Sequence, residues 1–239
     1  MNIPLSMLFE EQSQNNDKSS ILFLKQRCRN PVYTKNYASF SFLLDELSDS
    51  INKNREVIKE DKLFLIWHKA IVIHRLKSEP EKAKELLIKH IPQKAILETE
   101  LSMLNSLGLI CKSLGQKKEA SDYFAQAFEG VQFNNQYDDP TLPVRVGYNY
   151  ASQLFYKEKY LQVIAITNSS NEYLDMNYLS YMRGRNFYIL ARAYEKIEDY
   201  SSAEKYMKIA IDIFTSEGKP NYKEKASKDL EQIASKREI

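Results

Sequence analysis

The most reactive side chains in this 239-residue sequence are three histidines and two cysteines, and their spacing fits no metal site. His68 and His74 are six residues apart on one predicted helix, so they lie on different faces, and neither has a cysteine or paired carboxylates at ligand spacing. His90 stands alone. Cys28 and Cys111 are far apart, and we expect unpaired thiols, as in a reducing cytoplasm. Core or groove histidines and no bound metal are therefore expected.

Motifs for enzymatic chemistry are also missing from the sequence. It contains no glycine-rich phosphate loop, no nucleophile elbow, and no Cys–His pair with a plausible third member. We therefore expect a protein without a cofactor that is not an enzyme.

Composition favours a helical protein with balanced charge. With 43% hydrophobic residues but only six glycines and seven prolines, the chain has a sizeable core and few turns for short strands. The 34 basic and 32 acidic residues leave a net charge of +2, too small for a strongly nucleic-acid-binding surface. No secretory signal or membrane-length apolar run is present, so we expect a cytoplasmic protein that does not bind membranes.

The elements that must position any site are helix pairs of the tetratricopeptide (TPR) kind. Residues 101–128 match the TPR pattern, with small residues where two antiparallel helices approach and large residues between them. The matching positions are Leu104, Leu107, Gly108, Cys111, Gly115, Ala120, Phe124 and Ala127.

Three neighbouring repeats follow from this register. Ala83, Ala120, Val163 and Ala203 occupy equivalent positions, so the repeat steps are 37, 43 and 40 residues, longer than the roughly 34 of a standard TPR. Longer helices and loops such as Asn134–Pro143 are expected to absorb the excess.

Further helices are predicted at both ends of these repeats. A partial repeat has helices near Asp17–Arg29 and Tyr37–Ile51, and residues 221–237 form a capping helix with an apolar stripe. The predicted fold is an all-α, TPR-like, right-handed helical solenoid with about five helix pairs and a C-terminal cap. The stripe comprises Tyr222, Ala226, Leu230 and Ile233.

In such a solenoid the first helix of each pair lines the concave groove. Repeat positions 2, 5, 9 and 12 face this groove, although the register of the third repeat can slip by one residue. The predicted groove residues are His68 and Arg75; Asn105, Leu109 and Lys112; Asn149, Gln153 and Tyr156; and Arg185, Tyr188 and Arg192.

Two asparagines in this set suggest peptide binding. The side-chain amides of Asn105 and Asn149 each offer a donor and an acceptor, so they can pair with the backbone of an extended peptide. The basic groove residues can attract an acidic side chain or a terminal carboxylate. The alternative is that these are ordinary solvated helix residues.

Three stretches resemble the regulatory domain of PlcR-type regulators: LFLIWHKAIVIHRLKSEPEKAKELL, MLNSLGLICKSLG and VRVGYNYASQLFYKEKY. These are peptide-sensing transcription factors of low-GC Gram-positive bacteria, grouped with Rap, NprR, PrgX and Rgg, and the similarity covers about residues 17–235. In that family, asparagines on inner TPR helices hold the backbone of a short secreted and re-imported signalling peptide. The resemblance implies this role for Asn105 and Asn149.

The first residues, MNIPLSMLFEE, resemble the closing helix of a repressor-like helix-turn-helix domain. The expected organisation is therefore a remnant of that domain at 1–12, a linker at 13–19, and a TPR-like peptide-binding and dimerisation domain at 20–239. The recognition helix is absent, so DNA would be bound only through the missing N-terminal domain. A truncated chain is favoured over a naturally headless relative.

The leading hypothesis is the regulatory domain of a quorum-sensing transcriptional regulator. It binds a short linear signalling peptide in the groove, forms a homodimer, and transmits binding to a DNA-binding domain. The alternative is a TPR adaptor that holds a protein partner and has no DNA role.

Overall fold

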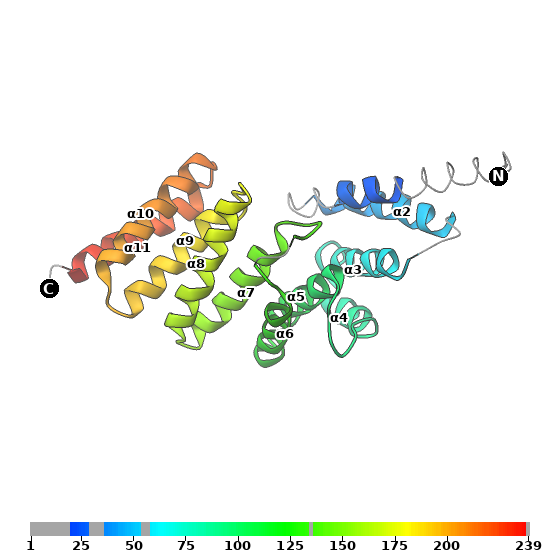
Figure 1. Cartoon of the computed structure of the whole chain (residues 1–239), viewed down its shortest axis with the longest axis horizontal. Helices are drawn as coiled ribbons and strands as arrows, with labels where there is room; N and C mark the ends of the chain where they lie inside the picture. The colour runs from blue at the N-terminus through cyan, green and yellow to red at the C-terminus, as the bar shows by residue number, and fades with distance from the viewer. Residues whose placement is uncertain (1–19, 29–35, 54–57, 134–135, 238–239) are drawn as a thin grey trace, which may run out of the picture. The chain divides into compact units, whose positions relative to one another are not determined.

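The chain folds into helices throughout the part that the computed structural model describes, residues 20–28, 36–53, 58–133 and 136–237. These residues form eleven helices and no strand (Figure 1). The first helix spans residues 20–28. The others are α2 (Tyr37–Lys53), α3 (Lys59–Arg75), α4 (Pro80–Ile88), α5 (Glu98–Ser113), α6 (Lys117–Gly130), α7 (Leu142–Tyr156), α8 (Tyr160–Met176), α9 (Arg183–Lys196), α10 (Tyr200–Ser216) and α11 (Pro220–Arg237).

These helices form five consecutive pairs along the chain, followed by the single helix α11, as predicted. The equivalent small residues Ala83, Ala120, Val163 and Ala203 are all at most 1% exposed, which confirms the repeat register. The predicted helix near Asp17–Arg29 begins outside the described residues.

The turns inside the four pairs from α3 to α10 have the same backbone geometry. Five residues before each equivalent small residue, Ser78, Gly115, Glu158 and Glu198 have φ angles of 56°, 74°, 60° and 64°. The next amide donates back to the first helix, as Gln116 N does to Cys111 O at 2.9 Å. This left-handed helix ending favours glycine, which only Gly115 supplies, so Gly115 closes its helix as predicted.

The chain divides into two units, Met1–Ala120 and Ser121–Ile239. In the first unit, α3 contacts α2, α4 and α5. Lys25 Nζ lies 3.0 Å from Asp61 Oδ1 and ties the helix over 20–28 to α3. Buried residues such as Phe40, Leu47, Phe64, Leu87, Leu101, Met103 and Leu107 fill the space between these helices.

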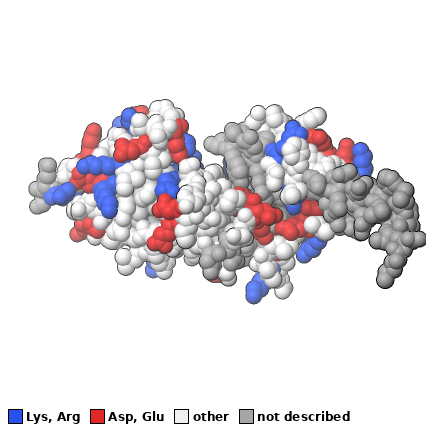
Figure 2. Space-filling model, turned by 45° about the horizontal axis from the view of Figure 1, so that its top comes forward, with Lys and Arg blue, Asp and Glu red and all other residues white. Residues whose placement is uncertain are grey.

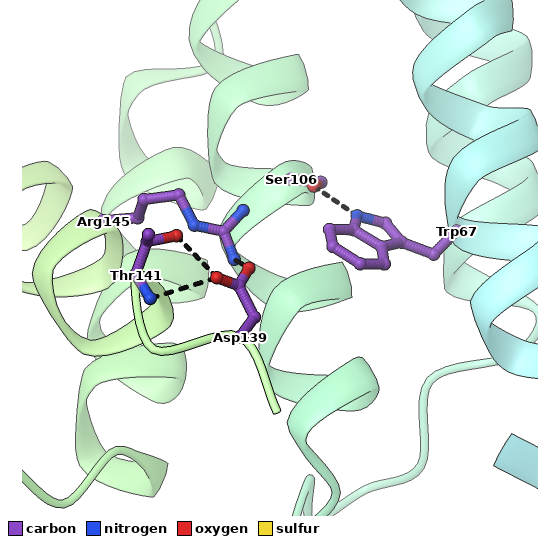
Figure 3. Close-up of polar contacts among 5 residues, drawn as sticks. All are labelled: Trp67, Ser106, Asp139, Thr141 and Arg145. Atoms are coloured by element: carbon purple, nitrogen blue, oxygen red, sulfur yellow. Dashed lines mark hydrogen bonds and ion pairs between the residues drawn. The ribbon is translucent and has the colours of Figure 1, made fainter. Parts of the chain in front are cut away.

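Trp67 occupies the predicted TPR tryptophan position in this core. It is 6% exposed, and its indole Nε1 donates to Ser106 Oγ at 2.8 Å, from α3 to α5 (Figure 3). A buried indole N–H needs such a partner. Packing therefore accounts for the single tryptophan of the sequence.

His74, near the end of α3, makes the first unit sensitive to acid. Burial lowers the pKa of this imidazole from 6.5 to about 4, and its Nε2 lies 3.0 Å from Ser113 Oγ. The folded state therefore keeps His74 neutral below pH 6.5, where the unfolded chain takes up a proton. The contribution of His74 to the free energy of unfolding is complete above about pH 6.5 and is lost as the pH falls towards 4.

Between pH 7 and pH 4.5 we expect the free energy of unfolding of His74→Gln to fall by about 1 kcal/mol less than that of the wild type, after allowance for solvent screening. Urea unfolding followed by Trp67 fluorescence at several pH values measures this difference. His90→Gln is the matched control, because His90 is exposed just after α4 and its Nδ1 lies 2.8 Å from Leu86 O, in the preceding turn of the chain. Equal pH profiles for the two variants would rule out His74 as the cause.

In the second unit, α7 contacts α8 and α9, α8 contacts α9, and α10 contacts both α9 and α11. One hydrophobic cluster is centred on Ala151, Leu154 and Val163. Another joins α9, α10 and α11, and the predicted stripe of α11 contributes Ala226 and Ile233 to it at 0% exposure. The cluster is composed of Ala191, Ala203, Met207, Ala210, Phe214, Ala226 and Ile233.

A buried ion pair holds the loop before α7. Asp139 Oδ1 accepts from Thr141 N at 3.0 Å and from Thr141 Oγ1 at 2.7 Å, and Arg145 Nη2 lies 2.7 Å from Asp139 Oδ2 (Figure 3). The predicted loop ended at Pro143, but α7 already begins at Leu142. Proline is tolerated in the first helical turn because those amides have no helical acceptor.

Candidate functional site

The second unit carries a pocket of about 260 Å³ between side chains of α7, α9 and α11. Its wall is mainly aromatic, with one aliphatic residue, one serine and two cations. The lining residues are Tyr148, Ser152, Phe155, Tyr156, Tyr188, Ile189, Arg192 and Lys225. Such a wall suits a ligand with a bulky apolar group and a few polar atoms.

Two pocket residues on α9 are fixed by one carboxylate on α11. Tyr188 Oη donates to Asp229 Oδ2 at 2.5 Å, and Arg192 Nη1 lies 2.9 Å from Asp229 Oδ1. Arg192 Nε also lies 3.0 Å from Glu195 Oε2, one turn further along α9. The side chain of Glu195 is 3% exposed, and its Oε1 pairs with Lys236 Nζ at 2.7 Å. The last helix therefore orients the α9 wall of the pocket.

The pKa values of the pocket residues reflect this environment. Burial raises the pKa of the Tyr188 hydroxyl, and the bond to Asp229 raises it further. Burial lowers the pKa of Arg192, but the carboxylates of Glu195 and Asp229 outweigh this and raise it overall. Burial also raises the pKa of Tyr148. At neutral pH Tyr148 and Tyr188 are therefore uncharged, and Arg192 is a fixed cation.

The structure brings three predicted groove residues, Tyr156, Tyr188 and Arg192, to this pocket. A fourth, Arg185, lies one turn before Tyr188 on α9. Its Nη2 donates to Tyr222 Oη at 2.7 Å, and its guanidinium lies 4.8 Å from the centre of the Tyr222 ring.

The α7 wall differs from the predicted set by one residue. The pocket is lined by Tyr148, Ser152 and Phe155, whereas Asn149 and Gln153 are half-buried on the neighbouring flank of the helix. Tyr156 is 76% exposed at the pocket rim. Most of the α7 residues that line the pocket therefore follow the register shifted by one residue, which the sequence analysis had left open.

The remaining predicted groove residues lie in the first unit. His68 is 1% exposed: its Nδ1 is 2.8 Å from Phe64 O, and it packs against the rings of Phe64 and Trp67. This burial assigns His68 to the core and not to a ligand-binding surface. Asn105 is 4% exposed, whereas Arg75 and Lys112 are exposed at the end of their helices.

Besides the α7 residues and Ile189, the sequence reasoning missed Lys225 and Asp229 on α11. That reasoning treated α11 only as a capping helix with an apolar stripe. Lys225, Asp229 and Lys236 nevertheless recur at spacings of four and seven residues, which places them on one helix face beside the apolar stripe. All three contact α9, at Tyr188, Arg192 and Glu195.

Charges elsewhere on the second unit are interspersed. Basic and acidic side chains alternate over its visible face in Figure 2. In the part of the chain that the structure describes, no three His, Cys, Asp or Glu side chains are grouped to hold a metal ion, and Cys28 and Cys111 are buried free thiols.

Within the same residues, no helix has both the length and the apolar character needed to cross a bilayer.

Comparison with solved structures shows the fold. The apo form of PlcR from Bacillus thuringiensis has a TM-score of 0.74 at 19% identity, covering 96% of this chain and 89% of that chain. PlcR in complex with the peptide PapR7 and DNA has a TM-score of 0.66 at 21% identity, covering 89% and 74%. The apo form of RapI has a TM-score of 0.62 at 10% identity, covering 91% and 72%. The predicted TPR-like solenoid fold is thus confirmed.

Comparison with curated proteins found no match. A family model, the RNPP family C-terminal domain, matches residues 32–231, which is most of the sequence. The resemblance to PlcR-type regulators in the sequence is therefore confirmed, and this chain belongs to the RNPP family.

Proposed function

We propose that this chain is the regulatory domain of a quorum-sensing transcriptional regulator, which binds a short signalling peptide on its first-position helices. The observation that carries the proposal is the pocket between α7, α9 and α11, in a chain with an RNPP C-terminal domain. A known PlcR structure contains the peptide PapR7 and DNA, which supports a peptide ligand here.

The pocket has the chemistry that an extended peptide needs. Tyr148, Phe155 and Tyr188 present aromatic surface at little entropic cost, since each ring has only two side-chain torsions. Ser152 and the cations supply hydrogen bonds that orient the ligand. One large side chain fills such a volume, while the rest of the peptide extends along the neighbouring helices.

Signal transmission would follow from the pocket's position across two repeats. A peptide that contacts α7 and α9 together favours one relative placement of these helices, and that preference is the differential affinity which allostery requires. The proposed organisation has residues 1–12 as the end of a helix-turn-helix domain, 13–19 as a linker and 20–239 as the sensing and dimerisation domain. Residues 1–19 lie outside the described part of the chain.

The test uses a pool of random synthetic heptapeptides, selected by affinity on the purified chain, and titration calorimetry with the best binder. We expect Tyr188→Ala to weaken binding at least about tenfold, because it removes an aromatic wall of the pocket. Tyr188→Phe keeps the ring and separates this effect from the bond to Asp229. Tyr178→Ala is the control, because Tyr178 is 97% exposed and lies outside the pocket.

Asn105→Ala and Asn149→Ala complete the set. Unchanged affinity of both variants for the selected peptide would rule out Asn105 and Asn149 as the clamp on the peptide backbone. It would not contradict binding in the pocket. Failure to select any peptide above an unfolded control would overturn the proposed function and favour the adaptor alternative.

A further inference from the structure

We infer that the pocket of the second unit binds a carboxylate next to a bulky apolar side chain, with Lys225 and Arg192 as the anion-binding pair. This inference rests on the proposed function, because it names the class of peptide that the pocket would select. Both cations line the pocket, and none of the residues that line it is acidic.

Lys225 is available for such a ligand. Its Nζ lies 5.3 Å from the centre of the Tyr188 ring, at the exposed edge of the pocket. None of the described carboxylates forms an ion pair with it. An ammonium held against an aromatic ring keeps its charge and its three donors for an incoming anion.

Arg192 supplies the second, more rigid half of the pair. Its Nε and Nη1 are held by Glu195 and Asp229 at 3.0 and 2.9 Å. A guanidinium has five N–H donors, so further donors remain after these two contacts. Because Asp229 also accepts from Tyr188, it positions the wall of the pocket.

The charges around the pocket favour an anion. Three cations, Arg192, Lys225 and Lys236, face two carboxylates, Asp229 and Glu195, within the linked set on α9 and α11. Arg185 stacks on Tyr222 nearby and adds a further positive charge. A ligand carboxylate would therefore enter a net positive, partly desolvated site, where a charge-assisted hydrogen bond is strong.

The apolar wall defines the neighbouring group. Tyr148, Phe155 and Ile189 also line the cavity, and their surface fits an aromatic or branched side chain. Two peptide sources combine these groups: a bulky C-terminal residue with its own terminal carboxylate, or an Asp or Glu side chain beside a bulky residue. Both share the chemistry that we infer.

The experiment uses three small probes and measures their dissociation constants by NMR titration. N-acetyl-phenylalanine carries a terminal carboxylate, its amide carries none, and N-acetyl-aspartyl-phenylalanine amide carries only a side-chain carboxylate. Lys225→Met removes the ammonium and keeps the stem. Lys223→Met is the matched control, because Lys223 is an exposed lysine on α11 that does not line the pocket.

We expect at least one acidic probe to bind the wild type and Lys223→Met about fivefold or more tighter than the neutral amide. In Lys225→Met this preference should disappear. The acidic probe that shows the effect identifies the source of the carboxylate.

Two results would overturn the inference: equal affinity for acidic and neutral probes, or a preference that survives in Lys225→Met. Absence of binding by all three probes up to millimolar concentration would also overturn it. Heptapeptides that bind without any preference for a carboxylate would leave the proposed function intact. Conversely, a Lys225-dependent preference for the acidic probes without any heptapeptide binding would contradict the proposed peptide binding but leave the inferred carboxylate site intact.

Discussion

Asp139→Ala is expected to lower the free energy of unfolding by about 3 kcal/mol. The side chains of Asp139 and Arg145 are 5% and 13% exposed, so removing the carboxylate leaves a guanidinium largely out of water. The Thr141 amide and hydroxyl lose the same acceptor. Each loss at a buried site costs more than the intact bond contributes, because the partner group was already desolvated.

Asp175→Ala is the matched control for this prediction. Asp175 Oδ1 lies 2.6 Å from Arg183 Nη2, but its side chain is 66% exposed. Exposed pairs of this kind contribute about 0–1 kcal/mol. Urea unfolding followed by circular dichroism compares the two variants. Equal losses in the free energy of unfolding would show that burial does not make the Asp139 pair more important for stability.

A double variant separates charge from packing. Asp139→Ala with Arg145→Met removes both charges and keeps an aliphatic chain at position 145. We expect it to be more stable than Asp139→Ala alone, because no largely buried charge remains beside the site that the carboxylate occupied.

The repeat register could be predicted because it depends on local packing. The TPR pattern has a small residue at the position of Ala120, where two helices approach, and a large residue at that of Phe124, one turn later. Both side chains are 1% exposed. These requirements involve residues a few positions apart, so they leave a periodic signal in the sequence. Ala83, Val163 and Ala203 carry the same signal and are equally buried.

The α7 wall shows how a shift of one residue in register changes which side chains line a pocket. Carrying Asn105, Leu109 and Lys112 forward by the 43-residue step from Ala120 to Val163 leads to Tyr148, Ser152 and Phe155. The sequence prediction placed its set one residue later, which rotates each side chain by about 100° around the helix. The structure places the earlier set in the pocket.

Burial and charge pairing between repeats were not predictable in the same way. His68 occupies a groove position by spacing, yet the rings of Phe40, Phe64 and Trp67 surround it. The contacts of Arg192 with Asp229 and of Glu195 with Lys236 join residues about 40 positions apart. Such pairs depend on how successive helices pack, which no short-range pattern in one sequence encodes.

Gly184→Ala is expected to destabilise the second unit by about 2 kcal/mol, because α9 and α10 approach too closely for a methyl group. A Cβ at Gly184 would lie 2.7 and 2.9 Å from two ring carbons of Phe214, and 3.1 Å from Ile213 Cγ2. Phe214 is 1% exposed in the cluster that joins α9, α10 and α11, so its ring has little room to move.

The expected loss of about 2 kcal/mol is a net value. It already includes the better helix propensity of alanine, which offsets up to about 1 kcal/mol of the steric cost. Phe214→Leu in the Gly184→Ala background should recover part of the loss, since a smaller side chain frees the space that the new methyl needs. The coupling between the two substitutions, measured by thermal or urea unfolding of both single variants and the double variant, identifies the steric contact. Additive losses would contradict it, because independent sites do not relieve one another.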